Sequence, residues 1–238
     1  MKTKKTKREG KKFLRRYMKL AHAIDLLATG KLAFLDPKTW TDKNDAYFIN
    51  AYKAHGQFKS ILACCFTQSS ERHHHWERFA KPVREASKGP AKVEGDNDTV
   101  CVVFDKEKLL ASLPKTVHLR AGEVKYKEIN EIKKASRIPA DWPYLKRYPY
   151  RDEQEYRIIV ESEARELDAP LGLRISLKAI DRVVVGPFAS LAKRDSMVAR
   201  IKKAAGPRRS IRVSKTTILD NAQWRKAVDI ALGRAKRA

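Results

Sequence analysis

The chain has 238 residues, with 52 Lys or Arg against 28 Asp or Glu, so its formal net charge at pH 7 is +24. Hydrophobic residues make up 42% of the chain, which is enough for a packed core and excludes wholesale disorder. So large a positive excess predicts a polyanionic partner, DNA or RNA before an anionic membrane surface. Apolar runs typical of a membrane span or a signal peptide are missing, so we expect neither.

The positive charge is concentrated at the two ends. Residues 1–20 hold ten Lys or Arg and one Glu, and residues 193–238 hold fourteen Lys or Arg and three Asp. Residues 1–12 lack apolar periodicity, so we expect a flexible basic arm, with a solubility tail or localisation signal as the alternative. The expected phosphate contacts are Lys4, Lys5, Lys7, Arg8, Lys11, Lys12, Lys202, Lys203, Arg208 and Arg209.

From residue 13 to residue 238 the pattern predicts one α+β domain. Strands are expected at 13–17, 31–35, 60–67, 100–104, 117–119, 124–126, 156–160, 173–177, 183–185 and 210–214, with 117–119 pairing to 124–126. Helices are expected at 23–29, from about 46 to 54, around Trp76, after Asp105, around Met197 and from about Asn221. Because these strands do not alternate regularly with long helices, we expect one mixed sheet of about seven or more short strands with flanking helices.

The densest cluster of charged residues directly precedes the predicted strand at 156–160. Glu153 and Glu155 are two residues apart, as are strand neighbours on one face, and Arg151 and Arg157 have the same parity. Two carboxylates between two guanidinium groups can hold a ribose hydroxyl and stabilise a developing cation. The alternative is a structural ladder of ion pairs between neighbouring strands.

Three other features invite a functional interpretation. The run His73, His74 and His75 cannot converge on one metal from a helix, so we expect a solvated helix face and no metal site. Cys64 and Cys65 lie in an apolar run, as buried thiols do, and with Cys101 as the third cysteine and no Cys-x-x-Cys motif we expect a reduced, cytoplasmic chain. The basic and aromatic stretch 142–150 suits either base stacking or a loop folded onto the core.

Several segments, taken in order over about residues 13–215, resemble a bacterial and phage family catalogued as domain of unknown function 2971. The shared segments are residues 13–17, 26–32, Pro37 with Trp40 and Asp42, 65–67 with Trp76, 99–105, the stretch from Lys146 to Arg157, and 184–187. Thr41 and Lys43 depart from the family pattern, which has Asn and Pro there.

A more distant resemblance links the chain to ADP-ribosyltransferases, which use an arginine on a first strand, a Ser or Thr on a second, and a Glu entering a later strand. The resemblance implies that Arg15 or Arg16 binds the pyrophosphate of NAD and that Thr67 or Ser69 fills the second role. It also implies catalysis by Glu155 or Glu153 at the nicotinamide-side ribose, and stacking of nicotinamide on Trp40, Trp76 or Tyr150. The Ser-Thr-Ser motif usual in that superfamily is absent here.

Two functional hypotheses follow, with a third behind them. The first is an NAD-dependent ADP-ribosyltransferase that modifies DNA or RNA, such as a toxin or phage-conflict effector with an antitoxin or inhibitor as partner. The second is a DNA- or RNA-binding protein without catalysis, in which the same carboxylates only organise the fold. The third is a nuclease, disfavoured because Glu155 stands where a Glu-x-Lys motif needs a lysine. The sequence leaves the oligomeric state open.

Overall fold

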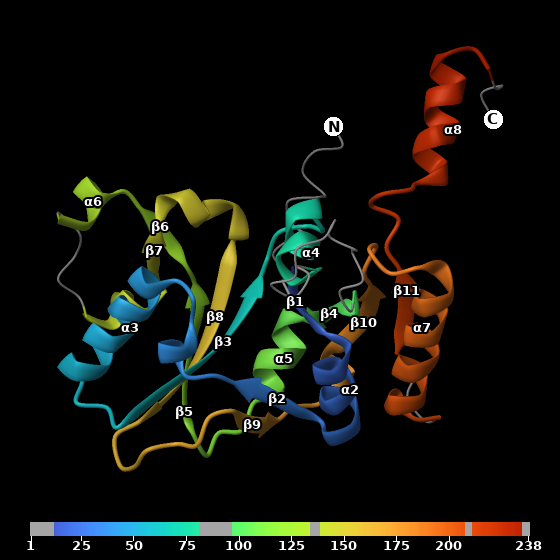
Figure 1. Ribbon diagram of the computed structural model, residues 1–238. Helices are drawn as coiled ribbons and strands as arrows, with labels where there is room; N and C mark the ends of the chain where they lie inside the picture. The colour runs from blue at the N-terminus through green and yellow to red at the C-terminus, as the bar shows by residue number, and fades with distance from the viewer. Residues whose placement is uncertain (1–11, 81–96, 134–138, 208–210, 235–238) are drawn as a thin grey trace, which may run out of the picture.

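The computed structural model describes residues 12–80, 97–133, 139–207 and 211–234. Its largest element is a seven-stranded sheet in the order β11-β10-β4-β1-β3-β8-β5 (Figure 1). These strands are β1 (Phe13–Lys19), β3 (Ser60–Thr67), β4 (Thr99–Asp105), β5 (His118–Glu123), β8 (Glu155–Ser162), β10 (Ile180–Val185) and β11 (Arg212–Lys215). All neighbours are antiparallel except β10 and β11, so the predicted mixed sheet and α+β class are confirmed.

Four further strands form two small ladders outside this sheet. They are β2 (Lys31–Phe34) with β9 (Leu171–Arg174), and β6 (Lys125–Lys127) with β7 (Leu145–Arg147). The expected pairing of 117–119 with 124–126 is therefore wrong. The first segment belongs to β5 and pairs with β8, whereas the second belongs to β6 and pairs with β7.

The central sheet has two halves that are joined by a very short ladder between β1 and β3. Along β1 and β3 only one pair of residues is in register, Arg15 with Thr67. By contrast, β1 follows β4 over seven residues and β3 follows β8 over eight. The strands on either side of this seam diverge, which opens room within the sheet itself.

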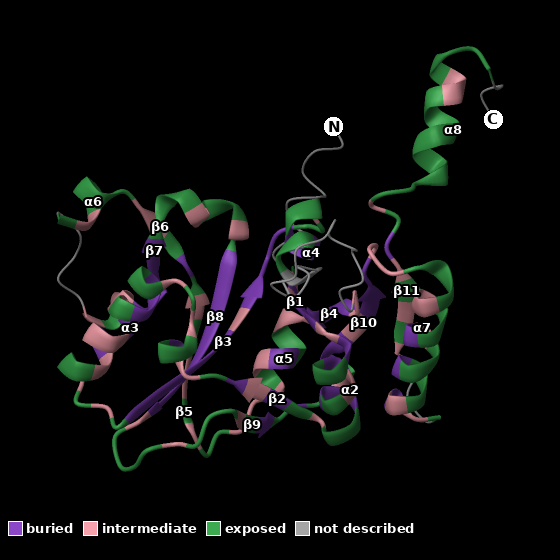
Figure 2. Ribbon diagram, viewed as in Figure 1, coloured by how far each residue is buried: buried purple, intermediate pink, exposed green. Residues whose placement is uncertain are grey.

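Helices cover both faces of the sheet, and together the three layers bury its strands (Figure 2). One face holds the main core, in which Leu14, Val102 and Ile158 pack against α2 (Leu20–Thr29), α5 (Lys106–Ser112) and α7 (Leu191–Ala205). The other face is covered by α3 (Lys43–His55) over β3 and β8, and by α4 (His73–Ala80) over β1 and β4. The space over the seam thus has one of these two helices on each side.

Local signals explain several boundaries. α2 ends at Gly30, whose φ of 68° suits a residue without a Cβ, and its N–H donates to the carbonyl of Leu26. The carboxylate of Asp42 caps α3 by accepting from the backbone N–H groups of Asn44 (3.0 Å) and Asp45 (3.3 Å). This cap fixes where Asp45 points.

The remaining elements are short or peripheral. The short helices are η1 (Pro37–Thr39), α6 (Ile129–Lys133), η2 (Pro139–Tyr144), η3 (Tyr148–Glu153) and η4 (Leu177–Ala179). The last helix, α8 (Ala222–Ala231), begins after Asn221 as predicted, carries no buried residue and projects away from the sheet (Figures 1 and 2). In the described part of the chain, no helix is both long and apolar enough to span a membrane.

Candidate functional site

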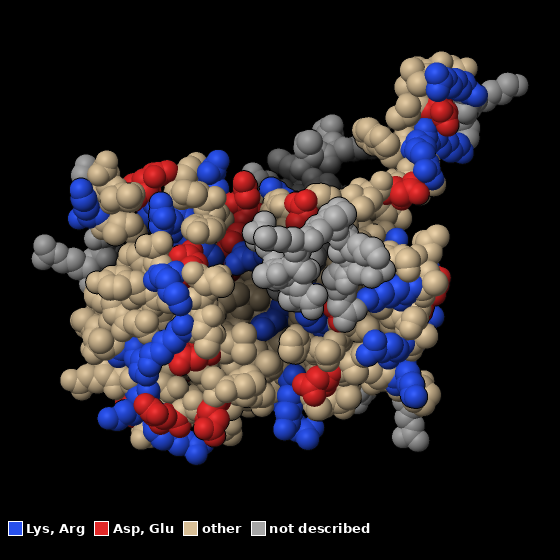
Figure 3. Space-filling view, viewed as in Figure 1, with Lys and Arg blue, Asp and Glu red and all other residues tan. Residues whose placement is uncertain are grey.

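A cavity of about 360 Å³ opens at the seam between the two halves of the sheet. Its lining combines residues of β1, β3 and β8 with residues of α3, α4 and the loops beside them: Arg15, Arg16, Tyr17, Leu35, Trp40, Thr41, Asp42, Asp45, Ala63, Cys65, Phe66, Thr67, His75, Arg78, Lys146, Glu153 and Glu155. Figure 3 shows a hollow near the centre of this face, with Lys and Arg side chains at its bottom. Its size lies in the range of small-molecule sites.

Glu155 is one of two deeply buried carboxylates of the cavity, with 5% of the residue exposed against 4% for Asp45. Its Oε1 accepts from Arg157 Nε at 2.9 Å, its Oε2 lies 3.0 Å from Lys146 Nζ, and its N–H donates to the hydroxyl of Tyr126 at 2.7 Å. Burial alone raises the pKa of a carboxyl group, but the charges of Arg157 and Lys146 outweigh it and lower the pKa of Glu155 to about 2. The carboxylate is therefore ionised at any physiological pH.

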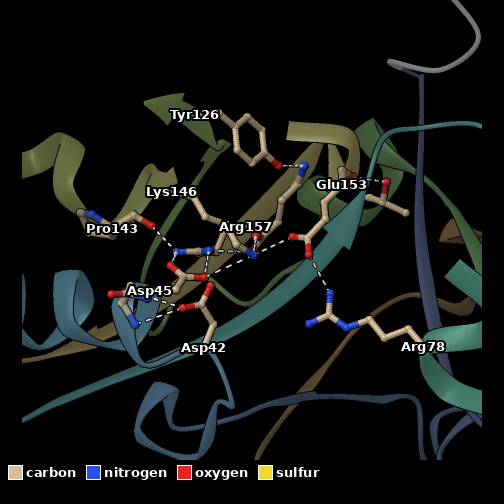
Figure 4. A network of polar contacts seen from close by, with 11 residues as sticks. Asp42, Asp45, Arg78, Tyr126, Pro143, Lys146, Glu153 and Arg157 are labelled. Atoms are coloured by element: carbon tan, nitrogen blue, oxygen red, sulfur yellow. Dashed lines mark hydrogen bonds and ion pairs between the residues drawn. The ribbon is translucent and has the colours of Figure 1, made fainter. Parts of the chain in front are cut away.

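Lys146 joins three carboxylates in this cluster (Figure 4). Its Nζ lies 2.6 Å from Glu153, 3.0 Å from Glu155 and 3.5 Å from Asp45. Burial on its own lowers the pKa of a lysine, yet here the neighbouring carboxylates, Glu155 foremost, raise the pKa of Lys146 above its usual value. Glu153 also accepts from Arg78 Nη1 at 2.7 Å, which connects the cluster to α4.

Arg157 is fully buried and anchors the cluster to α3. Its guanidinium makes a bidentate pair with Asp45, at 3.1 and 2.9 Å, and donates to the carbonyl of Pro143 at 2.6 Å. One face of the Trp40 ring lies 5.0 Å from the guanidinium carbon. Trp40 also lines the cavity, so a planar ligand group can stack on this ring.

Two arginines of β1 line the cavity where the two halves meet. Arg15 Nη1 donates to the carbonyl of Ser69 at 2.9 Å, and Arg16 contacts the thiol of Cys64. Arg16 also has its guanidinium carbon 5.9 Å from the centre of the Phe66 ring. Burial lowers the pKa of Arg15, because a guanidinium in a closed space loses solvation. An anion in the cavity would compensate both charges.

Thr67 and Ser69 have mainly structural contacts. The Thr67 hydroxyl donates to the backbone carbonyl of Glu153 at 2.5 Å and accepts from the N–H of Ser69 at 3.1 Å. Thr67 lines the cavity, whereas Ser69 is 2% exposed and is absent from the lining. In this conformation Ser69 therefore acts on the cavity through the carbonyl group that positions Arg15.

His75 corrects the expectation of a solvated histidine face. His73 and His74 are exposed, but His75 is 8% exposed and lines the cavity beside the Tyr17 ring, with the ring centres 5.1 Å apart. Burial, helped by the charges of His74, Arg72 and Arg15, lowers the pKa of His75 to about 4. Within the described residues, neither ring nitrogen has a hydrogen-bond partner. The imidazole is therefore neutral at the cavity wall, and a ligand can bond to its buried nitrogens only if the ring turns.

The structure brings Arg15, Arg16, Thr67, Glu153 and Glu155 to one cavity, but other expected positions differ. Glu153 and Arg151 precede β8 in η3, so strand alternation does not apply to them, and Arg151 is exposed beside the Tyr148 ring. Tyr150 is outside the lining, with its ring 5.0 Å from Lys146 Nζ. Trp76 is fully buried in the core and donates to Glu71, so it cannot stack on a ligand.

The expected phosphate contacts are placed only in part. Lys4, Lys5, Lys7, Arg8, Lys11, Arg208 and Arg209 lie outside the described residues. Lys12 is exposed at the start of β1. Lys202 and Lys203 are exposed on α7, which covers the main-core face of the sheet and not the face under α3 and α4. The cavity and these two lysines therefore lie on opposite sides of the sheet.

Three residues of the cluster escape sequence reasoning about the site: Asp45, Lys146 and Arg78. Asp45 has one local signal, because the helix cap at Asp42 places it in the first turn of α3. Lys146 belongs to β7, a strand of three residues inside a segment rich in Pro and Tyr. Nothing near Arg78 in the sequence indicates its contact with Glu153, which is 75 residues away.

Comparison with known proteins gives few matches. No family model and no curated protein sequence matches the chain, so the resemblance to domain of unknown function 2971 is not confirmed. Among solved structures, the chain is similar to Thermus sp. 2.9 DarT in complex with ADP-ribosylated ssDNA, with a TM-score of 0.43 and 11% identity over 86% of this chain and 94% of that one. For the same protein in complex with NAD+, the TM-score is 0.42 and the identity 10%, over 86% and 95%. Likeness at this level assigns no role to an individual residue.

Proposed function

We propose that the cavity binds NAD and that the chain transfers ADP-ribose from it to a nucleic acid. The observation that carries this proposal is Glu155, a buried carboxylate held ionised at the bottom of a cavity that arginines also line. NAD joins a pyrophosphate, two riboses and a cationic nicotinamide ring. Arginines suit the pyrophosphate, carboxylates suit the hydroxyl groups of the riboses, and the ring of Trp40, which lines the cavity, suits the nicotinamide.

The chemistry asks for a fixed negative charge. When the bond between the ribose carbon and the nicotinamide nitrogen breaks, the electron pair leaves with nicotinamide, and positive charge develops on the ribose. The carboxylate of Glu155 would stabilise that charge, most strongly in the transition state. A nucleophilic atom of the nucleic acid then bonds to the ribose carbon, and the proton that it loses passes to water or to a carboxylate of the cavity.

The remaining residues have supporting roles in this proposal. Lys146 and Arg157 fix the orientation of Glu155, and Arg15, Arg16 and Arg78, which line the cavity, would bind the pyrophosphate. The strong positive charge of the whole chain favours a nucleic acid as the acceptor. Toxicity, an antitoxin partner and a cytoplasmic location remain predictions from the sequence.

The test compares two buried carboxylates of the same strand. Glu155 lines the cavity, whereas Glu161 lies at the other end of β8, is equally 5% exposed, and pairs with His118 and Arg120. Purified wild type, Glu155→Gln and Glu161→Gln are incubated with NAD labelled in its adenylate part and with single-stranded DNA or RNA. We expect label on the oligonucleotide for wild type and for Glu161→Gln, and a loss of at least about 100-fold for Glu155→Gln.

The alternative is a nucleic-acid-binding protein without catalysis. One observation favours it: Glu155 is paired with both Lys146 and Arg157, as a purely structural carboxylate would be. In that case wild type consumes no NAD and labels no oligonucleotide, and both Gln variants lose stability without changing nucleic-acid affinity. That result would exclude the transferase.

A further inference from the structure

The register of the central sheet aligns three arginines with the cavity residue Glu155. Reading across the sheet at one level, Glu155 of β8 pairs with Thr67 of β3, and Thr67 pairs with Arg15 of β1. The same level continues across the sheet: Arg15 pairs with Val103 of β4, Val103 pairs with Arg182 of β10, and Arg182 pairs with Arg212 of β11. Residues directly opposite one another on paired strands point to the same face. We call Arg15, Arg182 and Arg212 the arginine row.

Contacts and exposure agree with this alignment. The guanidinium carbon of Arg182 lies 5.9 Å from the ring of Phe13, which has the same parity as Arg15 on β1. Exposure rises along the row, since the side chain of Arg182 is 33% exposed and that of Arg212 is 67% exposed. The row therefore leads from the cavity, past the buried Val103 between Arg15 and Arg182, to the solvent-exposed Arg212 on the edge strand.

The row keeps a positive charge after its own ion pairs are counted. Asp181 pairs with Arg182 at 2.6 Å and also with Arg212. One carboxylate thus serves two guanidinium groups, and Arg15 adds a third positive charge at the cavity. Burial lowers the pKa of Arg15, and the charge of Arg182 lowers it further. The row would therefore gain from a further anion.

Its dimensions fit an extended polyanion. Adjacent strands lie about 4.8 Å apart, so Arg15 and Arg182 are roughly 10 Å apart across the sheet, and Arg212 lies about 5 Å further on. One small anion cannot span that length, whereas the phosphates of one nucleic-acid strand can. Chemistry on a base needs that base outside a duplex, and Glu155 is a buried residue of the cavity lining.

We propose that the arginine row holds the backbone of a single-stranded nucleic acid and leads one nucleotide into the cavity. This inference rests on the proposed function for the identity of the reaction. The surface itself is tested by nucleic-acid binding alone, without any reaction. The row draws Arg15 and Arg212 from the two basic ends of the chain, but it lies on the face of the sheet away from Lys202 and Lys203.

The experiment removes two charges from each face. Arg182→Gln with Arg212→Gln is compared with Lys202→Gln with Lys203→Gln, and with Arg182→Lys with Arg212→Lys, which keeps the charge. The affinity for a fluorescent single-stranded oligonucleotide is measured at several salt concentrations. Each lost phosphate contact reduces the slope of log K against log salt by about 0.7, so we expect a reduction of about 1.4 for the first pair. The double variant Lys202→Gln with Lys203→Gln and the charge-preserving double variant Arg182→Lys with Arg212→Lys should both stay near the wild-type slope.

Three results would overturn the row. The first is that Arg182→Gln with Arg212→Gln keeps the wild-type slope of log K against log salt. The second is that Lys202→Gln with Lys203→Gln reduces that slope instead. The third is that poly-glutamate displaces the oligonucleotide as well as unlabelled DNA does. NAD binding, measured by calorimetry, separates this inference from the proposed function. If the wild type binds no NAD while Arg182→Gln with Arg212→Gln still reduces the salt-dependence slope, the proposed transferase function is contradicted and the arginine row is supported.

Discussion

Arg157 of β8 and Asp45 of α3 form a bidentate ion pair across 112 residues of sequence, and Arg157 has no exposed surface. Removing the guanidinium leaves Asp45 and Glu155 buried without their main counter-charge. We expect Arg157→Leu to lower the free energy of unfolding by about 3–5 kcal/mol. Chemical denaturation measures this loss.

Arg151 is the matched control for that experiment, because it is exposed and its guanidinium lies over the ring of Tyr148. Arg151→Leu should change the free energy of unfolding by less than about 1 kcal/mol. Equal losses in the two variants would show that the buried pair has no special weight.

The depressed pKa of Glu155 predicts an acid-sensitive fold. The unfolded chain takes up a proton near pH 4.5, whereas the folded chain does so only near pH 2. The contribution of this carboxylate to stability is therefore fully present above pH 4.5 and is lost as the pH falls toward 2, by roughly 3 kcal/mol in all. Glu155→Gln should lower stability at pH 7 and flatten this part of the profile. An unchanged profile would mean that other carboxylates dominate the acid response.

His75 predicts a change of opposite sign in stability and in binding. Its ring nitrogens are buried without partners in the described structure, so His75→Phe removes an unfavourable burial and should raise stability by about 1 kcal/mol. If the ligand bonds to the imidazole, the affinity for NAD should fall about five- to tenfold. Calorimetry and thermal melting check both. Tighter NAD binding by the variant would show that His75 does not contact the ligand.

The same histidine affects stability at mildly acidic pH. The unfolded imidazole takes up a proton near pH 6.5 and the folded one near pH 4, so the folded state becomes less stable as the pH falls between these values. His75→Asn should reduce that loss, whereas His22→Asn, at an exposed position on α2 and not among the groups that shift the pKa of His75, should leave it unchanged. Unfolding free energies at pH 7, 5.5 and 4 distinguish the two variants.

The basic arm carries a prediction that comes from the sequence alone. Deleting residues 2–12, which hold seven Lys or Arg and one Glu, should weaken oligonucleotide binding and flatten its salt dependence. The melting temperature should not change, because the described strands begin at Phe13. Equal binding of both forms at every salt concentration would assign the arm to another task.

Local patterns predicted strands far better than long-range partners. The run of apolar residues at 60–67 gave β3 with its observed bounds, and Gly30 marked the end of α2. The pairing of β6 with β7 was missed because a three-residue strand between Pro-rich turns has too few residues to show periodicity. Glu155 was found because residue type and strand position coincide there, whereas its partner Lys146 is fixed by tertiary packing.

The single register pair between Arg15 and Thr67 has a thermodynamic consequence. Since the cavity is lined from both sides of that seam, a bound molecule would contact both β1 and β3, whose ladder has a single register pair. A ligand that binds only the folded state raises the free energy of unfolding. The melting temperature should therefore rise with the fraction of protein that has ligand bound. A thermal-melting screen of nucleotides would identify the ligand that binds best.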